Sequence, residues 1–251
     1  MSIKEKASMI MHPAIKRFAS KALRGLKSAP ARTRGPLHDM HFSDLVAEYD
    51  VIIMKHCFPA SDILEDTGMA EPSSMRQSLE NYKTVYRQLR AKFDMHPDNL
   101  FVIWTLPPRH RLFTPSEGDK DENAARATAF SNWLKGQYLT EGVSHPNIRV
   151  WDFRGLVTEP DTNFLKYEYE LSHQRPDSHP NRLANDTAGP EFAKFIVDST
   201  IDFYDNRHNE KTIKILFLHH STGRNVYQYP SQGLPAWFEK LNGSSGITYL
   251  I

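Results

Sequence analysis

Five short apolar runs, separated by stretches with helical periodicity, constrain the fold of this chain more than any other feature. The runs are residues 51–57, 100–106, 148–153, 213–219 and 247–251. They are rich in Val, Ile, Leu and Phe with little polar alternation, a pattern typical of strands that are covered on both faces, as in parallel sheets. Strands that alternate with helices predict an α/β protein with three layers and a mostly parallel sheet.

The stretches between the runs predict the helices that cover this sheet. One apolar stripe runs through Met75, Leu79, Tyr82, Tyr86, Leu89 and Phe93, with Ser73 or Ser74 as the expected N-cap. Further helices are expected over residues 121–138, 188–204 and 234–241. The inward side chains of the first of these are Ala127, Phe130, Leu134 and Tyr138. Core positions are also expected for Trp104, Trp151 and Trp237.

The composition excludes several classes of protein. The 251 residues contain 31 Lys and Arg against 30 Asp and Glu, which gives no global case for nucleic-acid binding. The single cysteine, Cys57, excludes an intramolecular disulfide, and the sequence has neither a Walker A nor a GxGxxG glycine loop. No apolar run approaches the roughly 20 residues that span a bilayer, and a secretory signal is not expected. We expect a soluble cytoplasmic protein without cofactor or metal.

Residues 1–35 differ from the remainder, which we expect to form one domain over residues 36–251. Nine Lys and Arg stand against a single acid, Glu5, and residues 14–26 have the pattern of a basic amphipathic helix. Such a helix can contact a membrane surface or act as a targeting segment. The favoured interpretation is a helix that docks on its own domain and leaves its basic face in solvent.

Candidate catalytic residues follow the predicted strands, because ligands of open α/β sheets bind at the carboxyl ends of the strands. Ser221 comes two residues after the run at 213–219, and a serine hydroxyl is a weak nucleophile unless a base removes its proton. Asp177 and His179 lie two residues apart on one predicted loop, where they can supply the base and the carboxylate that orients it. The alternative is that Ser221 only caps the following helix.

Other side chains at the strand ends have competing interpretations. Cys57, beside His56, is a candidate thiol nucleophile, but a lone cysteine is more often a small buried apolar residue. Arg109 and His110 are candidates for contact with an anionic or sugar substrate, although a solvated loop is the favoured interpretation.

The histidines raise the question of a metal site. His219 and His220, together with His56 and His179, are candidate ligands. Adjacent residues of a strand point to opposite faces, so His219 and His220 are poorly placed to share one ion. We therefore expect His220 to line the site rather than to bind a metal.

Three segments resemble motifs of the SGNH hydrolases, the GDSL-type esterase superfamily: residues 50–63 (DVIIMKHCFPASDI), 176–181 (PDSHPN) and 215–225 (ILFLHHSTGRN). The resemblance implies a flavodoxin-like three-layer fold and hydrolysis of an ester, often an acyl or acetyl group on a carbohydrate or lipid. It implies that Ser221 is the nucleophile, His179 the general base and acid, and Asp177 the orienting carboxylate. The oxyanion or substrate-binding residues expected with them are Gly223, Asn225, Ser61 and His220.

The order of the motifs departs from that family. There the serine precedes the Asp and His, whereas Ser221 follows His179, which predicts a circular permutation with the nucleophile block at residues 213–251. A truncated second copy, or a swap that completes a neighbouring chain, is the alternative. The family also has Asp-x-x-His where this chain has Asp177-x-His179.

The oxyanion hole also departs from the family. The loop expected to carry its asparagine, residues 57–61, has none, so Ser61 or Asn225 is expected to take its place. The loss of one such donor typically costs about 100- to 1000-fold in rate. The sequence predicts a serine esterase that acts on an acyl, preferably acetyl, ester of a carbohydrate or similar small molecule. The alternative is a non-catalytic ligand- or glycan-binding protein on the same fold.

Overall fold

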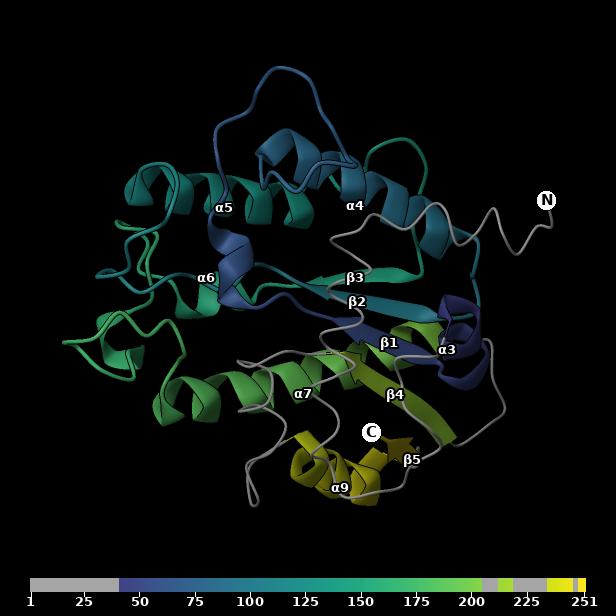
Figure 1. Ribbon diagram of the computed structural model, residues 1–251. Coiled ribbons are helices and arrows are strands. Elements are labelled where there is room, and N and C mark those ends of the chain that lie inside the picture. The colour runs from purple at the N-terminus through teal and green to yellow at the C-terminus, as the bar shows by residue number, and fades with distance from the viewer. Residues whose placement is uncertain (1–40, 205–211, 219–233, 246–247) are drawn as a thin grey trace.

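A single parallel sheet forms the centre of the protein. The computed structural model describes residues 41–204, 212–218, 234–245 and 248–251. Within them the strands are β1 (Val51–Met54), β2 (Leu100–Trp104), β3 (Ile148–Trp151), β4 (Thr212–Leu218) and β5 (Thr248–Leu250). Neighbouring strands all pair in parallel, in the order β3-β2-β1-β4-β5 (Figure 1). The predicted α/β class and parallel sheet are confirmed.

The central strand, β1, explains why the apolar runs lack alternation. Val51 pairs with Leu100 of β2 on one side and with Ile215 of β4 on the other. Ile52 packs into the apolar cluster on one face of the sheet, and Ile53 packs into the cluster on the other face. Neither side chain has any exposed surface, so both faces of the strand require apolar residues.

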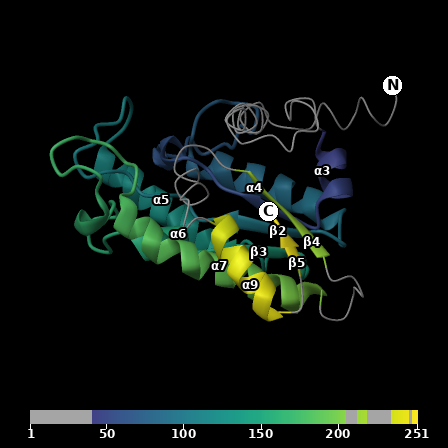
Figure 2. The ribbon, with the colours of Figure 1, turned by 90° about the horizontal axis from the view of Figure 1, so that it is seen from below.

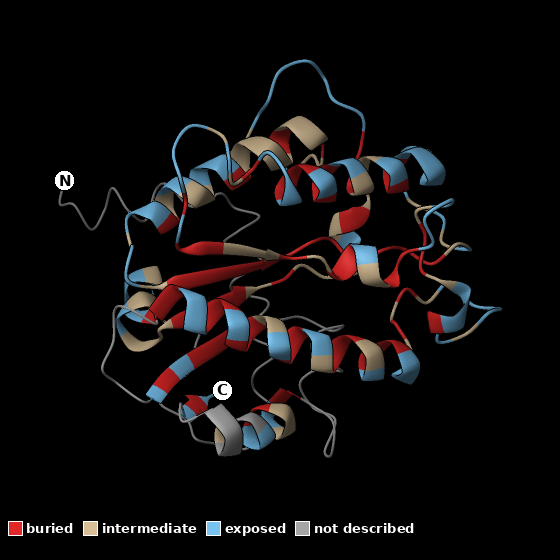
Figure 3. Ribbon diagram, turned by 180° about the vertical axis from the view of Figure 1, so that it is seen from behind, coloured by how far each residue is buried: buried red, intermediate tan, exposed pale blue. Residues whose placement is uncertain are grey.

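Helices cover both faces of the sheet and complete three layers (Figures 1 and 2). One face is covered by α3 (Phe42–Glu48), α4 (Leu79–Asp94) and α5 (Lys120–Lys135), and the other by α6 (Phe153–Val157), α7 (Arg182–Tyr204) and α9 (Leu234–Ser245). The buried positions of the helices lie on the sides that face the sheet, as the burial colouring in Figure 3 shows. Trp104 and Trp151 are buried and Trp237 is partly buried against the core, as predicted.

The predicted N-cap of α4 at Ser73 or Ser74 is wrong. The helix begins at Leu79, and the hydroxyl of Ser78 accepts a hydrogen bond from the amide of Asn81 at 3.4 Å. Met75, which was assigned to the apolar stripe, precedes the helix and is 56% exposed. The hydroxyl of Ser74 instead accepts from the amide of Arg76 within a turn. Serine satisfies backbone amides equally well in turns and at caps, so spacing alone did not separate the two.

The other helices also differ in their bounds from the prediction. α5 ends at Lys135, and Tyr138 lies beyond it but is fully buried. α7 begins at Arg182, six residues before the predicted start, and α9 continues to Ser245. Pro190 lies inside α7, a position at which proline normally interrupts a helix.

Some predictions concern residues that the structure does not describe. The basic segment at residues 1–35 and its expected helix lie outside the described residues. Among the helices that are described, none is long and apolar enough to cross a membrane.

Candidate functional site

Three loops meet at the carboxyl edge of the sheet. The 3-10 helix η3 (Phe58–Ser61) follows β1, residues 107–110 follow β2, and residues 175–181 precede α7. The hydroxyl of Ser61 donates a hydrogen bond to the carbonyl oxygen of Pro107 at 2.5 Å. The amide of His110 donates to the hydroxyl of Ser178 at 3.0 Å. These two bonds hold the three loops together as one surface.

Asp177 and His179 form a hydrogen-bonded pair on this surface. Oδ1 of Asp177 accepts from Nδ1 of His179 at 2.6 Å and from its backbone amide at 3.0 Å. Partial burial raises the pKa of Asp177, but these bonds and the electrostatic influence of His179 and His110 outweigh it and hold the pKa below its ordinary value. The ionised carboxylate keeps a proton on Nδ1 of His179, which leaves Nε2 as the basic nitrogen.

The ring of Phe58 supports this histidine from one side. The rings of Phe58 and His179 meet edge to face, with centroids 4.7 Å apart and planes at 89°. Phe58 begins η3, so the contact places the Asp177–His179 pair beside the loop that follows β1. The His179 side chain is 29% exposed, which leaves part of its surface open to a substrate.

The predicted nucleophile lies outside the described residues, together with His220, Gly223 and Asn225. The strand that leads to them, β4, ends at Leu218 on the same edge of the sheet as the histidine loop. Leu218 pairs with Met54, and its carbonyl oxygen accepts from the amide of Lys55 at 3.4 Å. The pairing of Ser221 with His179 therefore stays a prediction.

Ser61 is the one predicted oxyanion residue that the structure describes. Its side chain is buried, and the bond to Pro107 uses the only proton of its hydroxyl. In this arrangement Ser61 joins two loops. Its expected role as an oxyanion donor stays a prediction, and that role requires the bond to Pro107 to open.

Glu170 is a buried carboxylate that the sequence analysis did not single out. Its side chain has no exposed surface, and it lies 3.0 Å from Nε of Arg111, 3.3 Å from Nε2 of His110 and 2.9 Å from Nδ1 of His173. Its backbone forms an isolated antiparallel bridge with Pro180, one residue after His179. Glu170 thus ties residues 110–111 to the loop that carries the Asp177–His179 pair.

The protonation of His110 follows from its neighbours. Nδ1 of His110 accepts a hydrogen bond from the amide of Leu112 at 3.0 Å, so this nitrogen carries no proton. The proton is on Nε2, which lies 2.9 Å from the carbonyl oxygen of Ser172 and faces Glu170. The ring of His110 is thereby fixed in one orientation, and its amide anchors Ser178 between Asp177 and His179.

The expectation of a solvated loop at Arg109 and His110 is wrong, because the two residues are 7% and 0% exposed. Nε of Arg109 donates to Oδ1 of Asp62 at 2.8 Å, and Nη2 donates to Oδ2. The guanidinium lies over the ring of Phe113 at 3.7 Å and over that of Phe58 at 5.0 Å. Asp62 and Phe58 lie more than 40 residues from Arg109 in the sequence, and Phe113 is apolar. The residues next to Arg109 in the sequence therefore do not indicate that it is buried and paired.

A buried lysine lies at the end of β1. Burial lowers the pKa of Lys55 to about 7, and the nearby Cys57 opposes this effect only in part. Burial and the charge of Lys55 lower the pKa of His56 to about 4, so His56 is neutral at physiological pH. His56 packs near the rings of Tyr82 and Tyr86.

Within the described ranges, His, Cys, Asp and Glu side chains form no group of three or more suited to a metal ion.

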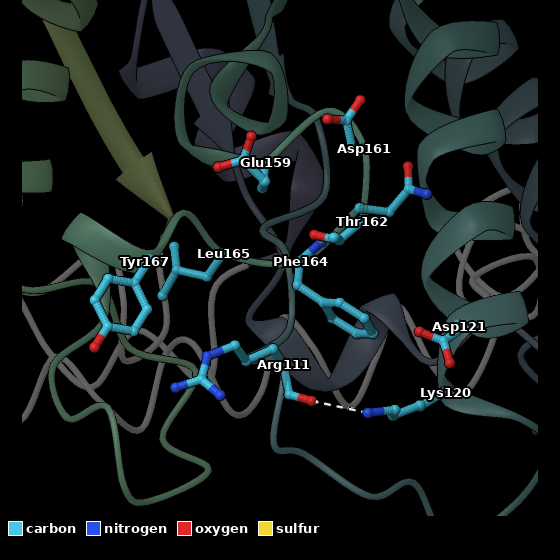
Figure 4. A pocket seen from close by; sticks show the side chains of 10 residues that line it. Arg111, Lys120, Asp121, Glu159, Asp161, Thr162, Phe164, Leu165 and Tyr167 are labelled. Carbon is cyan, nitrogen blue, oxygen red and sulfur yellow. Dashed lines mark hydrogen bonds between the residues drawn. The ribbon is translucent and has the colours of Figure 1, made fainter.

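A separate pocket of about 460 Å³ lies among the loops after β2 and α6 (Figure 4). Its lining mixes charged and aromatic side chains, including Arg111, Lys120, Glu159, Phe164 and Tyr167. Figure 4 shows the ammonium group of Lys120 bonded to the carbonyl oxygen of Arg111, at 3.1 Å. Neither Asp177 nor His179 lines this pocket.

Comparisons with protein-family models, with curated proteins and with solved structures find no match to this chain.

Proposed function

We propose that this protein is a serine ester hydrolase on a circularly permuted, SGNH-like fold, with Ser221 as nucleophile, His179 as general base and acid, and Asp177 as the orienting carboxylate. The observation that carries the proposal is the 2.6 Å bond between Oδ1 of Asp177 and Nδ1 of His179, at the sheet edge where β4 ends. The proposed substrate is an acyl ester, preferably an acetyl ester, of a carbohydrate or a similar small molecule.

The strand order supports the permutation. When the strands are counted from β4 through β5 and then β1, β2 and β3, the sheet order β5-β4-β1-β2-β3 reads 2-1-3-4-5. This is the order of flavodoxin-like sheets, which bind ligands at the point where strands 1 and 3 lie side by side. In this chain those strands are β4 and β1, which lead to Ser221 and to η3.

The length of the covalent chain limits how far Ser221 can lie from the end of β4. Three extended residues span at most about 11 Å, so the Cα atom of Ser221 lies within that distance of Leu218. Leu218 pairs with Met54, four residues before Phe58, and the Phe58 ring contacts His179. This continuity of the chain supports the proposed pairing of Ser221 with His179.

The proposed mechanism of ester hydrolysis uses Nε2 of His179 and the carboxylate of Asp177. Nε2 of His179 takes the proton of the Ser221 hydroxyl as its oxygen attacks the ester carbonyl, and Asp177 stabilises the imidazolium that forms. His179 then gives the proton to the departing alcohol, leaving an acyl-serine. His179 then removes a proton from water, whose oxygen attacks the acyl-serine, and returns this proton to the oxygen of Ser221 as the acid is released. Donors at Gly223, Asn225, His220 or Ser61 are the proposed partners of the oxyanion.

The test is hydrolysis of p-nitrophenyl acetate and of an acetylated sugar by the wild type, Ser221→Ala and His179→Ala. We expect both variants to lose turnover while circular dichroism shows an intact fold, and a serine-reactive phosphonate to label only proteins that retain Ser221. Activity that survives Ser221→Ala would refute the nucleophile.

A second candidate function is non-catalytic binding of a ligand such as a glycan. The observation that favours it is the pocket of about 460 Å³, which contains charged and aromatic side chains but neither member of the Asp177–His179 pair. Sugar binding that persists in Ser221→Ala and is lost in a pocket variant such as Lys120→Ala would support it, provided the wild type shows no esterase activity and no phosphonate labelling.

A further inference from the structure

Arg109 is fixed in place from three directions. Its Nε and Nη2 atoms donate to the two carboxylate oxygens of Asp62. The rings of Phe113 and Phe58 lie 3.7 Å and 5.0 Å from its guanidinium carbon. Its backbone carbonyl oxygen accepts from the amide of Leu165 at 2.8 Å. A guanidinium held in this way loses little further freedom when it binds a ligand.

One edge of this guanidinium has no hydrogen-bond partner among the described residues. A guanidinium has five N–H groups, and the pair with Asp62 occupies the edge formed by Nε and Nη2. Nη1 donates to none of the described residues. The Arg109 side chain is 8% exposed, and Nη1 is not among the buried side-chain atoms that lack a partner, so Nη1 reaches the solvent-exposed surface. The edge formed by Nη1 and Nη2 is thus a rigid donor pair that lacks an acceptor.

This donor pair lies close to the proposed catalytic base. The guanidinium carbon is 5.0 Å from the centre of the Phe58 ring, and the centre of the His179 ring is 4.7 Å from the same point. The guanidinium carbon of Arg109 and the centre of the His179 ring are therefore no more than about 10 Å apart, because their separation cannot exceed the sum of these two distances. A group bound by Arg109 is a few bonds away from an ester at His179.

We infer that Arg109 binds a carboxylate of the substrate, which makes the substrate an acyl ester of a sugar acid. This inference rests on the proposed esterase function. A planar guanidinium edge matches the two oxygens of a carboxylate. A phosphate offers similar oxygens but carries more negative charge, and Asp62 already places one carboxylate against this guanidinium. A singly charged carboxylate is the acceptor that this electrostatic balance favours.

The experiment compares O-acetyl glucuronate with O-acetyl glucuronamide, which differ only in whether the carboxyl group is charged. Acetate release by the wild type, Arg109→Lys and Arg149→Lys gives kcat/KM for each substrate. Lysine keeps the charge beside Asp62 but loses the planar edge. Arg149→Lys is the matched control, because Arg149 pairs with Asp202 near the start of β3, away from the carboxyl edge.

We expect the wild type and Arg149→Lys to prefer the acid over the amide by about 10- to 100-fold, the range of hydrogen bonds to a charged group. The preference should fall at least tenfold in Arg109→Lys, with the amide almost unaffected. Equal kcat/KM for acid and amide in the wild type would overturn the inference without requiring any variant to fold. A preference for O-acetyl glucose 6-phosphate over O-acetyl glucuronate would overturn the choice of carboxylate.

Equilibrium binding separates this inference from the esterase proposal. Glucuronate and glucuronamide are titrated into the wild type, Arg109→Lys and Arg149→Lys by calorimetry. If no ester is hydrolysed, the proposed function fails. Glucuronate binding that is lost only in Arg109→Lys would still support the carboxylate site. Glucuronate that binds no better than glucuronamide would overturn it.

Discussion

One carboxylate oxygen, Oδ1 of Asp177, accepts two hydrogen bonds from His179, one from the ring at 2.6 Å and one from the backbone amide at 3.0 Å. The backbone bond fixes the carboxylate relative to the chain, and the ring bond then fixes the imidazole relative to the carboxylate. The Asp-x-His spacing is therefore sufficient to orient a catalytic histidine. A residue further away is not required for this contact.

Asp177→Asn tests this arrangement. The amide keeps the size of the side chain but lacks the charge that holds the proton on Nδ1 of His179. If the proposed triad operates, we expect kcat for p-nitrophenyl acetate to fall by about 1000- to 10,000-fold, as in Ser-His-Asp enzymes. Asp186→Asn, on the exposed side of α7, is the control and should retain full activity. A loss smaller than tenfold in Asp177→Asn would remove Asp177 from the triad.

Ser61→Ala distinguishes a structural from a catalytic hydroxyl. Loss of the bond to Pro107 should lower the free energy of unfolding by about 1–2 kcal/mol, measured by urea denaturation. If the hydroxyl only joins the two loops, kcat should change by less than tenfold. A fall of about 100- to 1000-fold at unchanged fold would instead identify Ser61 as an oxyanion donor.

Glu170→Gln tests whether the buried carboxylate of Glu170 stabilises the protein near the Asp177–His179 pair. The amide removes the charge that faces Arg111, His110 and His173, and we expect the free energy of unfolding to fall by about 3 kcal/mol. Glu168→Gln, at an exposed position two residues away, should leave stability unchanged. Equal urea midpoints for the two variants would show that the cluster contributes nothing to stability.

Lys55 predicts a dependence of stability on pH. Its folded pKa of about 7 lies below the ordinary 10.5, so the unfolded chain binds more protons between these values and stability rises with pH there. The penalty for the buried charge is fully present below pH 7. Lys55→Met removes it, so we expect this variant to be more stable than the wild type at pH 6, with the difference shrinking toward pH 9.5.

The control for this prediction is Lys194→Met. Lys194 is an exposed lysine on α7 whose side chain is 76% exposed, so its replacement should not change the slope of stability against pH. Urea midpoints at several pH values provide the measurement. If the difference in urea midpoint between Lys55→Met and the wild type stays constant with pH, the prediction that burial lowers the pKa of Lys55 is contradicted.

The parts of the fold that depend on local pattern were predictable. The central strands were predictable because both of their faces are buried, as Ile52 and Ile53 of β1 illustrate. The Asp177–His179 contact was also predictable from local pattern, since only Ser178 separates its partners in the chain. Helix starts were less predictable, because Ser74 and Ser78 make similar bonds to nearby amides and only tertiary packing decides which one begins α4.

The buried charges could not be predicted from the sequence. Arg109 pairs with Asp62 and His110 faces Glu170, and each partner lies more than 40 residues away in the chain. A charged residue on a loop normally indicates solvent, so the pattern favoured exposure at Arg109. Arg109 is buried because three loops meet at one edge of the sheet, and no local pattern in the sequence indicates that these loops meet.

The position of β1 between β2 and β4 also affects the order of events during synthesis. Val51 pairs with both Leu100 and Ile215, and Lys214 donates its amide hydrogen to Asp50. Translation at 5–20 residues per second separates the appearance of Val51 and Ile215 by roughly ten to thirty seconds. Throughout that interval the nascent chain carries the apolar strand β1 with one edge unpaired, a state prone to aggregation. Chaperone protection of the emerging polypeptide is thus most needed before β4 leaves the ribosome.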